Sequence, residues 1–241
     1  MYKIQLGLDS SFFQSGVKAA LNWDYVHNPH MLVFGSTGSG KTYFVKLLLA
    51  KIGLYLPNAE VTICDFKADD FKFLSDSDNY FDFMRCTDGF NDFYNTFLNR
   101  QKGNDSCRDL RLLMFDEWAS YLNMLDKKEA EAAKNKLATL LMLGRSFNVH
   151  VLISQQRADA SYFSTARDNF SAVVALGNIS KESKQMFFSD FKDEMQPCGL
   201  GEGYVLFNGV ELKRLIVPTV RNERKLNFYI SQSLKPKASG G

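Results

Sequence analysis

An α/β fold with a mainly parallel central sheet flanked by helices is the architecture that this sequence predicts. Apolar segments of strand length alternate with longer helical patterns, and a glycine-rich loop joins the first such segment to a helix. The segments are apolar throughout, as expected for strands that helices cover on both faces. We predict strands over residues 30–34, 60–65, 110–115, 149–154 and 172–176.

Helices are predicted where apolar residues recur at helical spacing between these strands. Residues 42–52 follow the first strand directly, and we expect that helix to stop at Gly53, since glycine is common just past a helix end. Residues 126–143 place Ala and Leu on one face and Glu and Lys pairs on the other, before an expected stop at Gly144. A weaker pattern indicates a helix over 90–100.

The C-terminal part predicts an antiparallel hairpin added at one edge of the sheet. Residues 203–217 turn at Asn208-Gly209, a dipeptide typical of two-residue hairpin loops. The chain has 241 residues, which suffices for one large domain with its own core. We expect that domain to span 1–232 and a flexible tail to cover 233–241.

Composition limits the partners and the location of the protein. Lys and Arg total 29 against 27 Asp and Glu, so the net charge of +2 carries no global signature of nucleic-acid binding, and any DNA contact would be local. The longest apolar runs fall far below the roughly 20 residues of a membrane-spanning helix. The four cysteines form no C-x-x-C pair and no secretory signal peptide precedes them, which favours a cytoplasmic location.

The loop after the first predicted strand matches the phosphate-binding pattern G-x-x-x-x-G-K-[ST]. Its members are Gly35, Ser36, Thr37, Gly38, Ser39, Gly40, Lys41 and Thr42. Glycines let a loop wrap closely around a phosphate, and the amide groups that open the next helix face the anion. In this pattern Lys41 contacts the β and γ phosphates of ATP and the Thr42 hydroxyl ligates Mg²⁺. The alternative is an ordinary glycine-rich turn, which the position between a strand and a helix disfavours.

Two acids follow the strand predicted over 110–115. Asp116 ends that strand, and a carboxylate at the carboxyl end of a strand beside a phosphate loop can hold the magnesium shell. Glu117 is then placed to orient or deprotonate an attacking water. By itself, an acid pair after a strand is equally consistent with a solvated loop. With the phosphate loop upstream, the pair favours hydrolysis of ATP.

Two further side chains are candidates for the same chemistry. Gln156 follows the next strand at the same edge of the sheet, where it would contact the γ phosphate or simply close the strand. Arg145 follows Gly144, where it is either a cation at a helix end or an arginine supplied to the ATP of a neighbouring subunit. The sequence pattern leaves both alternatives open.

Taken together, these segments resemble the motor domain of the FtsK/SpoIIIE family, within the HerA/FtsK group of hexameric DNA-pumping ATPases with a RecA-like fold. Asp65-Phe66-Lys67 is similar to the Asp-Pro-Lys segment of that family, and residues 143–157 resemble its block of arginine, histidine and Thr-Gln-Arg. The resemblance implies that Arg145 is a trans-acting arginine finger and that Gln156 senses the γ phosphate. It also implies that both charged residues of the Asp-Phe-Lys segment border the nucleotide site or a subunit interface.

The same resemblance implies a function. A homohexameric ring with ATP and Mg²⁺ at each interface would move DNA through contacts to its backbone. Double-stranded DNA is favoured, and single-stranded DNA stays an open alternative. Conjugative transfer of a plasmid or integrative element is favoured, with relaxosome or secretion-channel proteins as candidate partners that recruit the ring to the inner face of the membrane. A packaging or replication-accessory ATPase of a virus or plasmid is an alternative. Another is an ATP-gated assembly module that recruits such partners without pumping.

Overall fold

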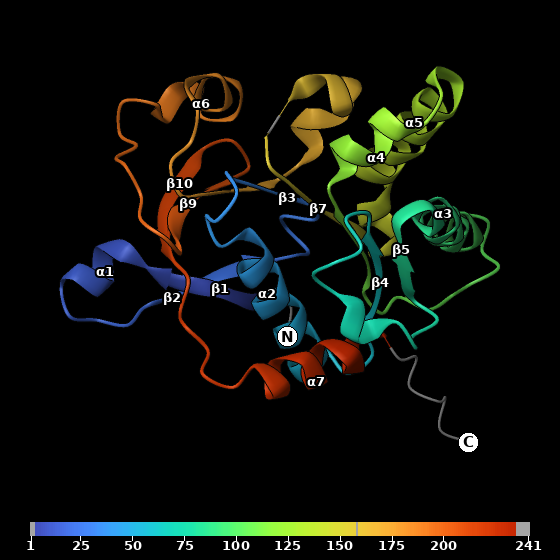
Figure 1. The fold of residues 1–241 in the computed structure, drawn as a ribbon, viewed down its shortest axis with the longest axis horizontal. Coiled ribbons are helices and arrows are strands. Elements are labelled where there is room, and N and C mark those ends of the chain that lie inside the picture. The colour runs from blue at the N-terminus through green and yellow to red at the C-terminus, as the bar shows by residue number, and fades with distance from the viewer. Residues whose placement is uncertain (1–2, 158, 235–241) are drawn as a thin grey trace.

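The computed structural model describes residues 3–157 and 159–234 and builds them around one mixed ten-stranded sheet (Figure 1). The strand order is β2-β1-β10-β9-β8-β3-β7-β6-β4-β5. The strands are β1 (Lys3–Asp9), β2 (Ala20–Asp24), β3 (Met31–Phe34), β4 (Glu60–Asp65), β5 (Tyr80–Asp82), β6 (Arg111–Asp116), β7 (Val149–Gln155), β8 (Ala172–Leu176), β9 (Glu202–Phe207) and β10 (Glu211–Ile216). Those from β8 to β5 run parallel, and the others pair antiparallel, which confirms the predicted α/β class.

The five predicted strands are all present, each within one residue of its expected bounds, as β3, β4, β6, β7 and β8. In β3, Met31 and Val33 join the hydrophobic cluster on one face of the sheet, whereas Leu32 and Phe34 join the cluster on the other. Every residue of this strand is therefore buried, and this explains why the sequence shows a continuous apolar run there rather than alternation.

The predicted C-terminal hairpin is also confirmed. Asn208 and Gly209 both have positive φ, 51° and 72°, and the Val210 amide donates to the Phe207 carbonyl at 3.0 Å, as in a type I′ turn. β9 pairs with β8, so the hairpin joins the parallel part of the sheet directly. Beyond it, β1 and β2 form the outermost antiparallel pair.

Helices cover both faces of the sheet (Figure 1). One face carries α2 (Lys41–Tyr55) and α7 (Glu223–Leu234), and the other carries α3 (Cys86–Gln101), α4 (Trp118–Met124), α5 (Lys127–Leu143) and α6 (Lys181–Phe187). A short helix, α1 (Ser10–Gln14), follows β1. Ser233 and Leu234 are buried residues of α7, so the expected tail over 233–241 is wrong in its first two positions, and 235–241 lie outside the described residues.

One of the two expected helix ends differs from the structure. α2 does not stop at Gly53 but continues to Tyr55. The glycine is needed for helix packing, because a Cβ there would lie 1.9 Å from the Tyr229 carbonyl oxygen of α7. The other expected end is confirmed, because α5 ends at Leu143, and Gly144, with a right-handed φ of −58°, begins a 3-10 turn over Gly144–Phe147. A Cβ at Gly144 would lie 2.3 Å from the Val149 carbonyl oxygen, so close packing also accounts for this glycine.

Replacing Gly53 with alanine is expected to destabilise the protein by about 3 kcal/mol, the upper range for overpacking, although alanine is normally the better helix former by about 1 kcal/mol. The reason is that the added methyl group meets backbone of α7, which cannot rotate away. Urea unfolding followed by circular dichroism measures the difference. The matched control is Leu54→Ala, because Leu54 is the exposed next residue of the same helix. Equal or higher stability for Gly53→Ala would contradict the packing role.

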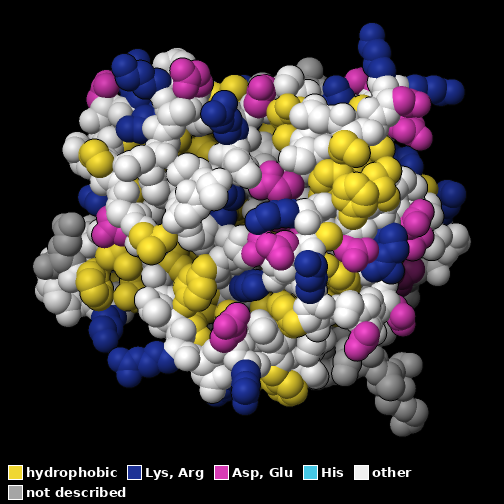
Figure 2. Space-filling model, in the orientation of Figure 1, with side chains coloured by type: hydrophobic (Ala, Val, Ile, Leu, Met, Phe, Trp, Pro, Cys, Tyr) yellow, Lys and Arg dark blue, Asp and Glu magenta, His cyan; other side chains and the backbone are white. Residues whose placement is uncertain are grey.

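Charged side chains are interspersed on the face drawn in Figure 2, where acidic and basic groups lie side by side near its centre. No broad basic field covers this face, in keeping with the net charge of +2. Contacts to a nucleic acid on this face would therefore have to be local.

Candidate nucleotide site

The loop between β3 and α2 has the backbone that its glycines predict. Gly38 and Gly40 have positive φ, 80° and 96°, in the left-handed region that other residues resist. A Cβ on Gly35 would lie 2.4 Å from the Leu176 carbonyl oxygen of β8, so this position needs glycine for close approach. The loop leads straight into α2, which has no side-chain cap at its N-terminus. The first amide groups of a helix lack partners within it and are suited to bind an anion.

Lys41 is the first residue of α2, and only 9% of its surface is exposed. Its ammonium donates to the carbonyl oxygens of Gly35 at 2.7 Å and of Ser36 at 3.4 Å, so the side chain lies along its own loop. Burial lowers the pKa of Lys41, and the charges of Glu117 and Asp116 oppose this shift. A phosphate at the loop would give the buried ammonium a negatively charged acceptor.

A cavity of about 310 Å³ lies beside this loop. Its lining includes Lys41, Thr42, Asp70, Asp116, Glu117 and Gln156. The loop and α2, the segment after β4, and the carboxyl ends of β6 and β7 therefore contribute to one space, the edge where parallel α/β sheets bind ligands. Four predicted candidates from distant parts of the sequence, Lys41, Asp116, Glu117 and Gln156, meet there.

Asp116 ends β6 and is 5% exposed. Burial raises the pKa of Asp116 to about 7, a hydrogen bond with the Ser154 side chain opposes that rise, and the charge of Glu117 adds to it. A buried carboxylate without a cation is costly, so the position suits a metal ion.

Magnesium fits the donors of this cavity. The Thr42 hydroxyl and the Asp116 carboxylate are oxygen ligands of the kind that Mg²⁺ prefers. Within 3–157 and 159–234, no group of three or more His, Cys, Asp or Glu side chains is arranged to hold a metal. Mg²⁺ characteristically takes one or two protein ligands and completes its shell with waters and substrate phosphates, so these two donors suffice once a nucleotide is bound.

Glu117 directly follows β6 with an unusual backbone. Its φ of 57° is left-handed, and its amide donates to the Ser154 carbonyl oxygen at 2.7 Å. Non-glycine residues in this region cluster at functional sites, because surrounding structure must hold them there. Burial raises the pKa of Glu117, whereas the Lys41 charge and a hydrogen bond from the Gln156 side chain oppose the rise. The carboxylate thus has a hydrogen-bond partner in Gln156 and an opposite charge nearby in Lys41.

The two glutamines that end the β7 region point to different surroundings. Gln155 is fully buried, and its side-chain nitrogen donates to the Arg157 carbonyl oxygen at 2.6 Å. Gln156 lines the cavity and hydrogen-bonds Glu117. Gln156 is therefore the glutamine placed to contact a bound nucleotide.

Asp70 is a residue of this cavity that the sequence analysis missed. The Thr42 hydroxyl donates to its Oδ2 at 3.2 Å. The sequence places this acid three residues after Lys67, and that spacing could have indicated it. Lys67 also lines the cavity. Asp65, by contrast, is not among the residues that line the cavity. It ends β4, is fully buried, and accepts hydrogen bonds from the amides of Ala68 and Phe71, each at 3.1 Å.

Arg145 does not line this cavity. It belongs to the 3-10 turn at the amino end of β7, whereas Gln156 follows the carboxyl end, and seven extended residues span about 20 Å. Arg145 instead lines a separate hollow of about 570 Å³ together with His27 and Arg167. Contact between Arg145 and a nucleotide therefore requires a second subunit.

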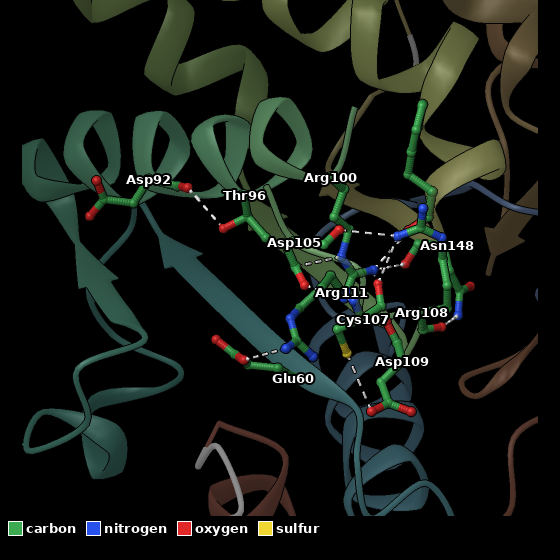
Figure 3. A network of polar contacts seen from close by, with 11 residues as sticks. Glu60, Asp92, Thr96, Arg100, Asp105, Cys107, Arg108, Asp109, Arg111 and Asn148 are labelled. Atoms are coloured by element: carbon green, nitrogen blue, oxygen red, sulfur yellow. Dashed lines mark hydrogen bonds and ion pairs between the residues drawn. The ribbon is translucent and has the colours of Figure 1, made fainter. Parts of the chain in front are cut away.

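A buried arginine fixes the turn that carries Arg145. Arg100 of α3 is 1% exposed and donates to the carbonyl oxygens of Asp109 at 2.9 Å and Phe147 at 2.8 Å. Its Nε also pairs with Asp105 at 3.0 Å. Figure 3 shows this side chain reaching from α3 to the segment around Asn148. The network holds the end of the turn rigidly against the sheet, so Arg145 projects from a fixed base.

The raised pKa of Asp116 predicts how stability depends on pH when metal is removed by EDTA. Below about pH 4 the Asp116 carboxyl is protonated in both the folded and the unfolded state. Between about pH 4 and 7 it stays protonated only in the folded state, so the free energy of unfolding decreases as the pH rises, by up to about 1.4 kcal/mol per pH unit. Asp116→Asn should remove this decline, and urea unfolding at several pH values measures it. Ser154→Ala, which removes the neighbouring partner but leaves the carboxyl group, should retain it. Parallel pH profiles for wild type and Asp116→Asn would contradict the shift.

A strand, a glycine-rich loop and a helix, with an acid pair at the end of a neighbouring strand, define a P-loop nucleoside triphosphatase. The family model for the central domain of the HerA helicase matches residues 10–141, more than half of the sequence, and the chain belongs to that family. It is also 30% identical over 224 residues to the FtsK domain-containing protein YdcQ of Bacillus subtilis, covering 84% of this chain and 46% of that protein. The family resemblance inferred from the sequence is thus confirmed.

Solved structures show the same fold. The cytoplasmic domain of the type VII secretion ATPase EccC from Thermomonospora curvata superposes with a TM-score of 0.70 at 18% identity, covering all of this chain and 31% of that one. The pCW3 conjugation coupling protein TcpA, solved with ATPγS, gives 0.71 at 16% identity, covering 89% and 65%. The chain thus spans only part of each of these proteins. Among the described residues, no helix has both the length and the hydropathy to cross a membrane.

Proposed function

We propose that this chain is the ATP-hydrolysing motor of a DNA translocase that works as a homohexameric ring. The observation that carries the proposal is the cavity in which Glu117, hydrogen-bonded to Gln156, faces Lys41 and Thr42 of the phosphate loop. This arrangement provides phosphate binding, metal binding and a base for water in one place. The likeness to TcpA, a conjugation coupling protein, favours transfer of a plasmid or integrative element as the setting.

In this mechanism each side chain has one task. Lys41 would turn from the loop carbonyls to the β and γ phosphates. Thr42 and Asp116 would hold Mg²⁺, which when bound would supply positive charge beside the phosphates. Glu117 orients water in line with the γ phosphate and accepts its proton. Gln156 contacts both Glu117 and the γ phosphate, so loss of that phosphate releases the segment after β7.

The chain's own Arg145 would complete the site of a neighbouring subunit. Mixing Arg145→Ala subunits with Glu117→Gln subunits should then restore part of the ATPase rate, because some interfaces pair an intact Glu117 with an intact Arg145. The rate is measured across mixing ratios, and each variant alone serves as the baseline. The comparison variant is Arg167→Ala, which removes another arginine that lines the same hollow as Arg145. Activity that never exceeds the baselines would contradict a shared site.

Movement of DNA is tested by displacement of streptavidin from biotinylated duplex ends. Wild-type protein with ATP should displace it, and Glu117→Gln protein should not. Efficient ATP hydrolysis without displacement would favour the alternative of an assembly module that recruits DNA-processing or secretion partners. Displacement only from complete viral or plasmid genomes held by a capsid or replication complex would favour the packaging or replication-accessory alternative.

A further inference from the structure

The segment after β4 brings a second acidic group to the metal end of the nucleotide cavity. Asp70 Oδ2 accepts a hydrogen bond from the Thr42 hydroxyl at 3.2 Å and lies 3.8 Å from the Lys67 ammonium. The Asp70 side chain is 25% exposed, and the residue lines the cavity together with Asp116 and Glu117. The hydroxyl that is expected to ligate magnesium is therefore already held by a carboxylate.

The position of Asp70 is built into the fold. Asp65, at the end of β4, accepts from the Ala68 and Phe71 amides, each at 3.1 Å, and so winds the segment between them into a tight loop. Ala68 adopts a left-handed φ of 56°, and Phe71 is fully buried beneath the loop. Both ends of the loop are thus anchored, and Asp70 is held facing Thr42.

We propose that Asp70 is a positioning residue of the magnesium site: it aims the Thr42 hydroxyl at the metal and accepts a hydrogen bond from a metal-bound water. This inference rests on the proposed binding of ATP with magnesium. Mg²⁺ keeps several waters, and such waters need acceptors around the site. Asp116 is assigned to the metal and Glu117 to the attacking water, so Asp70 is the cavity carboxylate left for a magnesium-bound water.

The charge of Asp70 gives this role a signature that a merely structural role lacks. Without a divalent cation, a carboxylate beside the phosphates repels them, so its removal should strengthen nucleotide binding. With magnesium, its removal takes away an acceptor for a bound water and the partner of Thr42, so binding should weaken. The two conditions therefore shift in opposite directions.

The test measures dissociation constants of a fluorescent, slowly hydrolysed ATP analogue in EDTA and in Mg²⁺. For Asp70→Asn, the factor by which Mg²⁺ strengthens binding should fall about tenfold, the lower range for substitutions around a metal site. Asp69→Asn is the matched control: Asp69 is the neighbouring residue of the same loop, 62% exposed, and its ion pairs are with Lys67 and Lys72 at 3.7–4.0 Å. That variant should keep the wild-type factor. Asp70→Glu, which retains the acceptor, should recover part of it.

The inference is overturned if Asp70→Asn keeps the wild-type magnesium factor. It is also overturned if binding weakens equally in EDTA and in Mg²⁺, since that result indicates a loop that Asp70 merely supports. Failure of the broader proposal is distinguishable, because wild-type protein would then bind the analogue under neither condition. Circular dichroism of each variant verifies the fold.

Discussion

Glu117→Gln is expected to bind ATP as tightly as the wild type or more tightly while its steady-state hydrolysis rate falls by about 100- to 10,000-fold, the range attributed to a general base. Glutamine has the same shape as glutamate, so the hydrogen bond with Gln156 can persist. What is lost is the group that accepts the proton of the attacking water. Phosphate release reports the rate, and titration with labelled ATP reports binding.

The control for this variant is Glu131→Gln. Glu131 is an exposed residue of α5 that pairs with Lys134 at 3.0 Å and is not among the residues that line the cavity. Its rate should equal that of the wild type. A Glu117→Gln enzyme with normal turnover would remove Glu117 from the chemistry, whereas loss of ATP binding in that variant would point to a structural role for the strained turn after β6.

Lys41→Ala is expected to reduce ATP hydrolysis by about 1,000-fold or more and to weaken ATP binding, because a buried cation at the phosphates is lost from both ground state and transition state. The free protein should fold normally, since the hydrogen bonds that the Lys41 ammonium makes within the described residues go to carbonyl oxygens of its own loop. Labelled-ATP titration and phosphate release provide the two readouts.

The comparison variant is Lys46→Ala, in the same helix, whose ammonium lies 5.5 Å from the Phe71 ring and 5.6 Å from the Phe73 ring rather than in the phosphate loop. Its hydrolysis should remain close to wild type. Comparable loss in both variants would mean that α2 tolerates no change, and retained hydrolysis in Lys41→Ala would contradict the assignment of the loop.

The central strands and the phosphate loop could be predicted from the sequence because burial on both faces leaves long apolar runs, and the loop needs glycines at fixed positions. The stop predicted at Gly53 was wrong, whereas the stop at Gly144 was confirmed. Gly53 marks a close approach of α7, whose residues are distant along the chain. A glycine looks the same in the sequence whether it ends a helix or admits a neighbour.

The candidate site was predictable where chemistry and strand ends coincide, as for Asp116, Glu117 and Gln156. Asp70 was not, because its place depends on the hydrogen bonds by which Asp65 winds the intervening loop. The left-handed backbone of Glu117 was likewise invisible, since it depends on the pairing of β6 with β7. Whether Arg145 reaches a neighbouring nucleotide depends on assembly and stays a prediction.

The most direct test of a DNA-moving ATPase is the steady-state rate of ATP hydrolysis measured without nucleic acid, with single strands and with duplex, alongside the particle mass at the same concentrations. A ring motor predicts a rate that duplex DNA increases strongly and single strands increase less, together with a mass six times that of the 27.4 kDa chain. A slow rate that neither form of DNA changes, in a particle that never reaches that mass, would contradict it.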